Sequence, residues 1–224
     1  MKNAAEDGPG KSSLIRNAMD VRQATRRSWP RSTQREARID QVLGRRQPDL
    51  TVVLEDVHDP HNAAAVLRSC DATGVLEIQT VHEHETAPGK LPSRATSSSA
   101  TKWVPVVQHD DIATCYAALR ERGMQIVATA LTDESIDLYD VDFTRPTAIV
   151  MGNEHRGLTT AAIAGADLTV RIPMSGMVES LNISVATAVT LFEAFRQRRV
   201  AGLYDEPQLT GEELARLRNE WLTK

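Results

Sequence analysis

The residues best placed to bind a ligand lie between Ile172 and Asn182, in a polar loop that precedes a long helical pattern. Pro173 restricts the backbone and Gly176 frees it, which is typical of a loop shaped around a ligand. Ser180 and Asn182 stand where the helix should begin, and their side-chain oxygens can accept hydrogen bonds from the unpaired amides of the first turn. The pattern predicts that a helix start and a ligand site coincide here.

A second set of candidates follows the apolar run that ends at Val57. The residues from His58 to His61 predict a turn, Asn62 is a good N-cap for the next helix, and Arg68 projects from the middle of that helix. A mid-helix arginine beside apolar residues is as often a surface side chain, with its stem on apolar neighbours, as a functional one. The imidazole of His61 could act as a base near neutral pH. The residues alone leave the role of Arg68 open.

A third candidate region follows the apolar run at 148–151. Gly152 stands where a parallel strand would end, and ligands of α/β proteins approach the backbone at that place. Glu154 then lies in a predicted turn before a helix, although an ordinary strand-to-helix turn with an exposed glutamate has the same pattern. The sequence contains no GxGxxG motif, which argues against an ordinary Rossmann dinucleotide site.

The elements that must position these residues alternate along the chain. We expect strands near 51–57, 76–81, 104–107, 125–130, 147–151 and 168–172, and helices over 62–73, 110–122, 158–165 and 180–199. This alternation predicts an α/β fold in which a parallel sheet carries helices on both faces. In the last of these helices, Val185, Val189 and Phe192 recur at helical spacing and are expected to face the core.

The N-terminal region differs in charge from the rest of the chain. Residues 1–38 hold nine Lys or Arg and four Asp or Glu, whereas the whole chain has a net charge of −4. We expect a flexible basic extension over residues 1–32 and an Arg-bearing helix from Thr33 to Arg46. A basic segment suits a nucleic acid, but a solvated tail has the same composition. At the other end, the capping-box pattern from Thr210 to Glu213 predicts a short helix.

Composition excludes several classes of protein. With 224 residues, of which 41% are hydrophobic and 25% charged, the chain is long enough for one substantial core. No apolar run approaches the roughly 20 residues that cross a bilayer, and no signal-peptide pattern begins the chain, so we expect a soluble, cytoplasmic protein. Cys70 and Cys115 lack CxxC spacing and no cluster of ligand side chains has metal-binding spacing, so we expect neither a disulfide nor a metal.

Three segments of the chain carry a resemblance to a known family. They are LEDVHDPHNAAAVLRSCDATGV at 54–75, IVMGNEHRGLT at 149–159 and IPMSGMVESLNISVATAVTLFEAFRQR at 172–198. In this order they resemble the three motifs of the SPOUT RNA 2′-O-ribose methyltransferases, with the greatest likeness to the tRNA (guanosine-18) enzymes of the TrmH type. The resemblance runs from about Arg35 to Gly202. It implies a methyltransferase domain over 33–202 with a deep C-terminal trefoil knot, a helical tail over 203–224, and a homodimer.

The resemblance also assigns roles to particular residues. The implied catalytic residues are Arg68, Asn62, Glu154, Ser180 and Asn182. The implied binding residues for S-adenosylmethionine are Thr129, Leu131, Gly152, Ile172, Met174 and Leu181. A basic surface is expected to engage the phosphates of tRNA through Arg35, Arg38, Arg45, Arg46, Arg196, Arg198 and Arg199.

The implied activity is S-adenosylmethionine-dependent 2′-O-methylation of a tRNA ribose, at guanosine 18. Three alternatives use the same core: ribosomal RNA as substrate, another tRNA position, or a catalytically silent RNA-binding relative. Within the reaction, Arg68 would stabilise the developing alkoxide, because a guanidinium stays protonated; a role as general base is the alternative.

Overall fold

The computed structural model describes residues 31–82 and 100–224. The extension predicted over residues 1–32 lies almost entirely outside these ranges. The chain divides into two compact units, Met1–Arg38 and Ile39–Lys224, and the boundary falls within helix α2 (Arg31–Leu43). All of the strands and the remaining helices described below belong to the second unit.

The second unit contains a parallel sheet whose strands, in the described part of the chain, follow the order β3-β2-β1-β6-β4-β7-β5. The strands are β1 (Leu50–Glu55), β2 (Ile78–Val81), β3 (Val106–His109), β4 (Gln125–Thr129), β5 (Ile136–Asp137), β6 (Thr147–Met151) and β7 (Leu168–Arg171). Strands β1 and β6 are neighbours, with Leu54 opposite Met151. Because all pairs are parallel, the loops after β1, β6, β4 and β7 emerge at one edge of the sheet.

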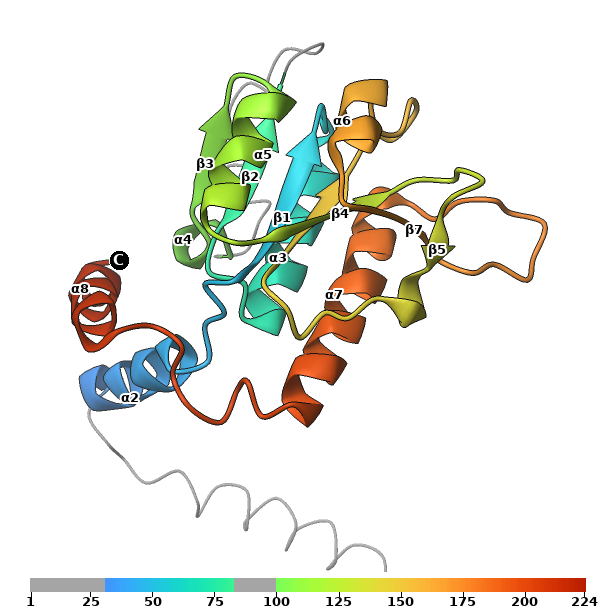
Figure 1. Ribbon diagram of the computed structural model, residues 1–224. Coiled ribbons are helices and arrows are strands. Elements are labelled where there is room, and N and C mark those ends of the chain that lie inside the picture. The colour runs from blue at the N-terminus through green and yellow to red at the C-terminus, as the bar shows by residue number, and fades with distance from the viewer. Residues whose placement is uncertain (1–30, 83–99) are drawn as a thin grey trace, which may run out of the picture. The chain divides into compact units, whose positions relative to one another are not determined.

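Helices cover both faces of this sheet, as the alternating pattern predicts. Helices α3 (Pro60–Thr73) and α7 (Ile183–Val200) pack side by side against one face, where Leu67 and Leu191 are fully buried (Figure 1). Helices α5 (Ile112–Glu121) and α6 (Thr160–Gly165) pack against the other face. In the described ranges, no helix is long and apolar enough to cross a membrane.

The beginning of α3 differs from the prediction. The N-cap is Asp59, whose carboxylate accepts a hydrogen bond from the backbone N–H of His61 at 2.8 Å, and Pro60 is the first helical residue. Proline suits that position because it has no N–H to leave unpaired and its φ is already helical. The helix therefore starts before Asn62, which lies in the first turn with its side chain available for other contacts.

The prediction for the buried face of α7 is partly wrong. Val185 and Phe192 are 47% and 51% exposed, and only Val189 packs against the core. The buried face instead includes Thr187 and Thr190, whose hydroxyls donate to backbone carbonyls one turn earlier at 2.7 and 2.9 Å. Because these hydroxyls are satisfied within the helix, threonine can be buried, and the apolar residues are left at the surface.

Three short elements were not expected from the sequence: α4 (Ala100–Trp103), the two-residue strand β5, and the 3₁₀ turn η1 (Leu138–Asp140). β5 and η1 have only two and three residues, which is too short to show a period. The C-terminal helix α8 (Gly211–Leu222) begins with the predicted capping box at Thr210 and Glu213. Its Leu217 and Trp221 pack with Leu43 of α2 in a small separate core.

Cys70 and Cys115 are both buried and free. Burial raises the pKa of Cys70, and it raises the pKa of Cys115 to about 12. A thiol that stays protonated is a poor nucleophile, so these residues serve packing.

Candidate active site at the carboxyl edge of the sheet

A cleft of about 450 Å³ opens among the loops after β4, β6 and β7 and the start of α7. Its lining includes all six residues that the sequence analysis assigns to the cofactor: Thr129, Leu131, Gly152, Ile172, Met174 and Leu181. Glu154 and Ser180 also line it. The volume lies in the range of small-molecule sites, and the carboxyl edge of a parallel sheet is where α/β proteins bind ligands. The structure thus gathers residues that are up to 52 positions apart, from Thr129 to Leu181.

Gly152 has a role in the turn as well as in the cleft. The turn is closed by two backbone hydrogen bonds between Asn153 and Gly157, at 3.0 and 2.9 Å. A Cβ atom at residue 152 would lie 2.5 Å from the carbonyl oxygen of Gly157. From the sequence, this glycine is expected to allow the approach of a ligand, but the chain's own turn already excludes any side chain there.

Polar side chains from the three motif segments form one hydrogen-bonded row, which we call the amide network. The Nδ2 of Asn62 donates to Glu154 Oε1 at 2.9 Å, and the Nδ2 of Asn182 donates to Asn62 Oδ1 at 3.1 Å. The Oδ1 of Asn182 accepts from the backbone and hydroxyl of Ser184, at 2.9 and 2.6 Å, and so caps α7 as predicted. Each amide has one orientation that satisfies these bonds, so the network fixes the direction of every donor toward Glu154.

Asn153 has a structural role that is not among the expectations from the sequence. Its Oδ1 accepts hydrogen bonds from the backbone N–H groups of His155 and Arg156, at 2.9 and 3.1 Å. Its Nδ2 donates to the backbone carbonyl of Asp56 at 2.9 Å. Asn153 therefore shapes its own turn and ties it to the loop after β1. Asparagine is common in turns because its side-chain oxygen can bond the backbone two residues on, and this preference is the signal that could have found Asn153.

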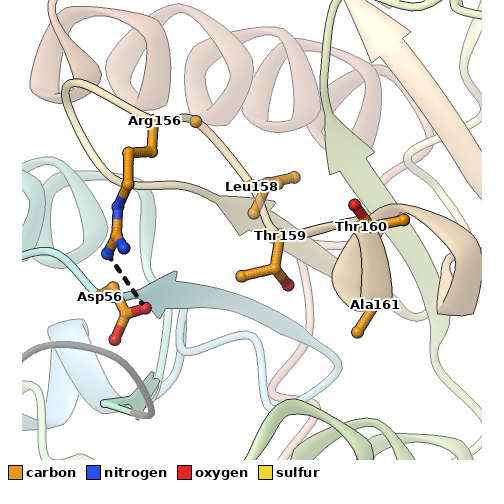
Figure 2. Close-up of a pocket in the computed structure, with 7 residues that line it drawn as sticks. Asp56, Arg156, Leu158, Thr159, Thr160 and Ala161 are labelled. Atoms are coloured by element: carbon orange, nitrogen blue, oxygen red, sulfur yellow. Dashed lines mark ion pairs between the residues drawn. The ribbon is translucent and has the colours of Figure 1, made fainter.

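A second hollow, of about 440 Å³, adjoins the same turn and shares the segment from Arg156 to Leu158 with the cleft. Figure 2 shows Arg156 reaching toward Asp56, where the guanidinium and carboxylate are 3.5 Å apart. Asp56 has a φ of 51°, in the left-handed region that aspartate tolerates better than most residues. Beside it, the carboxylate of Glu55 accepts from the N–H and hydroxyl of Thr159, at 2.9 and 2.7 Å. These contacts pin the turn to the end of β1.

The predicted RNA-binding arginines separate into two groups. Arg45, Arg196 and Arg199 are exposed, as are Arg35 and Arg38 on α2. The Nε and Nη2 of Arg196 donate to the two carboxylate oxygens of Glu193, at 2.8 and 2.7 Å, and the guanidinium of Arg199 lies 5.6 Å from the centre of the Phe195 ring. Arg68 is exposed on α3 and does not line the cleft, although Asn62 on the same helix belongs to the amide network.

The assignment of Arg46 and Arg198 to an RNA surface is corrected by the structure, because both side chains are fully buried. Arg198 donates to the carbonyl of Phe143 at 2.8 Å, and to the carboxylate of Asp49 at 2.5 Å. Arg46 donates to Asp71 at 2.6 Å, and burial lowers the pKa of its guanidinium. Neither side chain can reach a phosphate, so both arginines are structural.

Replacing Arg198 with methionine is expected to lower the free energy of unfolding by about 3 kcal/mol, because removing one partner of a buried pair leaves carbonyls and a carboxylate unsatisfied. Urea denaturation followed by circular dichroism measures this. Arg199→Met is the matched control: Arg199 is exposed on the same turn, and its loss is expected to cost less than about 1 kcal/mol. Equal losses in both variants would contradict the structural role of Arg198.

The fold and the cleft together define a class of protein: an α/β protein that binds a small molecule at the carboxyl edge of a parallel sheet, without the Rossmann glycine motif. Polar side chains of three separate segments of the chain converge beside the cleft, which is typical of an enzyme. In the described ranges, no group of three or more metal-ligating side chains is assembled.

The chain belongs to the SpoU rRNA methylase family, whose model matches residues 49–192. It is 49% identical to a tRNA (guanosine(18)-2′-O)-methyltransferase of Thermus thermophilus, over 87% of this chain and 98% of that protein. The solved structure of the TrmH/SpoU tRNA modifying enzyme from A. aeolicus superposes with a TM-score of 0.77 and 37% identity, covering 86% of this chain and 96% of the other.

A third comparison concerns the cofactor. The SpoU methyltransferase AviRb from Streptomyces viridochromogenes, solved in complex with the cofactor AdoMet, superposes with a TM-score of 0.61 and 28% identity, covering 70% of this chain and 62% of that one. These likenesses confirm the predicted SPOUT fold. The knotted path of the C-terminal segment stays a prediction.

Proposed function

We propose that this protein transfers a methyl group from S-adenosylmethionine to the 2′-hydroxyl of guanosine 18 in tRNA. The observation that carries the proposal is the amide network, which joins Asn62, Glu154 and Asn182 from the three motif segments beside the cleft. The likeness to the T. thermophilus enzyme over nearly its whole length supports the choice of tRNA as substrate.

The cleft fits the cofactor. Leu131 is 65% exposed at the cleft, and Ile172, Met174 and Leu181 add further apolar surface, which suits the flat face of an adenine ring. The hydroxyl of Thr129 is already used, since it donates to the carbonyl of Val150 at 2.9 Å. When bound, S-adenosylmethionine supplies an electrophilic methyl group on a sulfonium. The protein then has to hold the ribose hydroxyl in line with that methyl group and stabilise the charge on the oxygen.

Arg68 is proposed to stabilise the charge on the 2′-oxygen, and the amide network is proposed to position the nucleotide. The guanidinium of Arg68 is exposed and permanently charged, so it can approach the ribose and stabilise the developing negative charge on the 2′-oxygen. Proton loss from a guanidinium is costly, and a phosphate or water is therefore the better proton acceptor. Asn62, held by Glu154 and Asn182, positions the nucleotide, together with Ser180 in the loop before α7.

The direct test is to incubate the protein with unmodified tRNA and labelled S-adenosylmethionine and to map the methylated nucleotide. We expect label on the 2′-oxygen of guanosine 18, and no label on a tRNA that carries adenosine at that position. Label only in ribosomal RNA or at another tRNA position would replace the proposed substrate. Binding of tRNA without any label, when cofactor binding is confirmed by calorimetry, would indicate a silent relative.

The exposed arginines are proposed to bind tRNA phosphates. The double variant Arg196→Ala, Arg199→Ala is expected to weaken tRNA binding about tenfold and to reduce the slope of log K against log salt by about one to two, because two phosphate contacts are lost. Filter binding at several salt concentrations measures both quantities. Arg216→Ala on α8, an arginine of similar exposure, serves as the control. An unchanged slope in the double variant would remove Arg196 and Arg199 from the interface.

We further propose a homodimer that uses the outer face of α7, and a cytoplasmic location, where tRNA is found. Val185 and Phe192 lie seven residues apart on that face and are about half exposed, and Val178 of the preceding loop is 60% exposed. Two exposed apolar side chains on one helix face, as Val185 and Phe192 are, are typical of an interface.

Phe192→Glu is expected to convert the dimer into monomers at micromolar concentration, because a carboxylate cannot be buried there without a partner. Sedimentation equilibrium measures the mass. Val107→Glu, at a valine on β3 that is 37% exposed, is the control and should not change the mass. A dimer that persists in the Phe192 variant would place the interface elsewhere.

A further inference from the structure

His58, in the loop after β1, lies between two side chains of the turn that follows β6. Its Nδ1 is 3.5 Å from the Nδ2 of Asn153 and 3.8 Å from the Oε2 of Glu154. His58 is partly exposed, with 43% of its side chain accessible, whereas the side chain of Glu154 is only 13% exposed. From the sequence alone, His58 is expected only to form part of a turn.

Asn153 and Glu154 favour opposite protonation states of the Nδ1 of His58. The Oδ1 of Asn153 is occupied by two backbone N–H groups, so the end that faces His58 is the NH₂ group, which can only donate. Asn153 therefore favours an unprotonated Nδ1. The carboxylate of Glu154 can only accept, so it favours a protonated Nδ1. One nitrogen cannot serve both partners at once, and its proton decides between them.

A proton on the Nδ1 of His58 would give the carboxylate of Glu154 a second hydrogen bond. Its Oε1 accepts from Asn62, while its Oε2 is buried and makes no hydrogen bond to any described residue. A protonated His58 would supply the second bond and hold the carboxylate at both oxygens. A carboxylate held at one oxygen can rotate, and Asn62 and Asn182 would move with it because the network is continuous.

We propose that His58 is a positioning residue: its protonated ring binds Glu154 Oε2 and thereby holds the amide network in the arrangement that serves methyl transfer. The proposal rests on the proposed function, in which Glu154 and Asn62 belong to the reacting site. His58 acts through Glu154 and is not itself assigned a contact with the nucleotide.

The other charged and titratable groups of the two loops have partners or positions of their own. The ring of His155 is 6.4 Å from that of His58, so a charge on His155 would oppose one on His58. Arg156 pairs with Asp56, and Asp59 caps α3. His61, in the first turn of α3 next to the loop after β1, is exposed. Among the carboxylates of these two loops, Glu154 is the one whose oxygen lies 3.8 Å from the Nδ1 of His58.

The first test reads the proton directly and needs no RNA. Nitrogen-15 NMR of the imidazole rings reports the fraction of His58 that carries a proton on Nδ1. At a fixed pH near neutrality, Glu154→Gln is expected to lower that fraction, since a charged acceptor is lost, and Asn153→Ala is expected to raise it, since a competing donor is lost. If Asn153→Ala does not fold, the result for Glu154→Gln decides the test by itself. An unchanged fraction in Glu154→Gln would overturn the proposal.

The second test reads the effect on methyl transfer. The ratio of wild-type kcat to that of His58→Ala is expected to be close to one at pH 8.5 and to rise about three- to tenfold at pH 6, because the bond to Glu154 needs a protonated ring and acid favours that form of an imidazole. His58→Gln retains a donor whose charge does not change with pH, so its ratio should stay nearly constant. His109→Ala, on β3, is the histidine control.

A ratio for His58→Ala that does not change with pH would overturn the positioning role, even if the NMR result were as expected. Absence of methyl transfer in the wild-type protein would instead defeat the proposed function, and the NMR test would still decide whether the proton of His58 is shared with Glu154. The two failures are therefore distinguishable.

Discussion

Arg68→Ala is expected to lower the rate of methyl transfer about a thousandfold, while cofactor affinity stays within about twofold and the free energy of unfolding within about 1 kcal/mol. The reason for the large effect is that the guanidinium acts on charge that exists only in the transition state. The reason for the small effects is that Arg68 is exposed on α3 and does not line the cleft. Single-turnover kinetics, calorimetry with S-adenosylmethionine and urea denaturation measure the three quantities.

Arg68→Lys separates the two chemical roles. An ammonium can still stabilise an alkoxide, but it lacks the planar donors of the guanidinium, so partial activity with an unshifted pH profile would support stabilisation. If the residue is a base, the lysine variant should instead gain rate at a lower pH than the wild type, because lysine loses its proton more readily. Near-normal activity of Arg68→Ala would contradict both the stabilising role and the base role, and therefore the main catalytic assignment.

Asn62→Asp is expected to lower the rate about a hundredfold at neutral pH, although the two side chains have the same shape. The substitution replaces the donor that faces Glu154 Oε1 at 2.9 Å with a second carboxylate oxygen. Two carboxylates at this distance repel unless they share a proton. Activity should therefore recover partly as the pH falls, because one of the pair then takes up a proton and becomes a donor. The pH profile of kcat for this variant measures the effect.

The double variant Asn62→Asp, Glu154→Gln tests whether this contact is the cause. It restores one donor and one acceptor with the direction of the bond reversed, so its rate should exceed that of Asn62→Asp alone at neutral pH. Residue 62 keeps an acceptor oxygen in every variant. The hydrogen bond from Asn182 to residue 62 is therefore the same in all of them. Additive losses in the double variant would mean that Asn62 acts independently of Glu154.

The predictions from local sequence that hold are those that depend on near neighbours. The alternation of apolar runs indicated a parallel sheet with helices on both faces, and the loop before α7 indicated that Asn182 would cap that helix. Caps and periods depend on residues within about one turn, so a sequence expresses them directly. The resemblance to a family added six cofactor-binding residues, and all six line one cleft. Periodicity alone could not have predicted that these residues lie together.

The tertiary structure decided which polar residues act on ligands and which hold the fold. Arg198 and Arg199 are adjacent, yet the partner of Arg198 is Asp49, 149 positions away, and Arg199 is exposed. Asn62 binds Glu154 across 92 positions and Asn182 across 120. The threonines of α7 are buried because their hydroxyls bond within the helix, and Phe192 is left outside. A local pattern shows that a side chain is charged or apolar, but its partner and its burial are set when distant segments pack together.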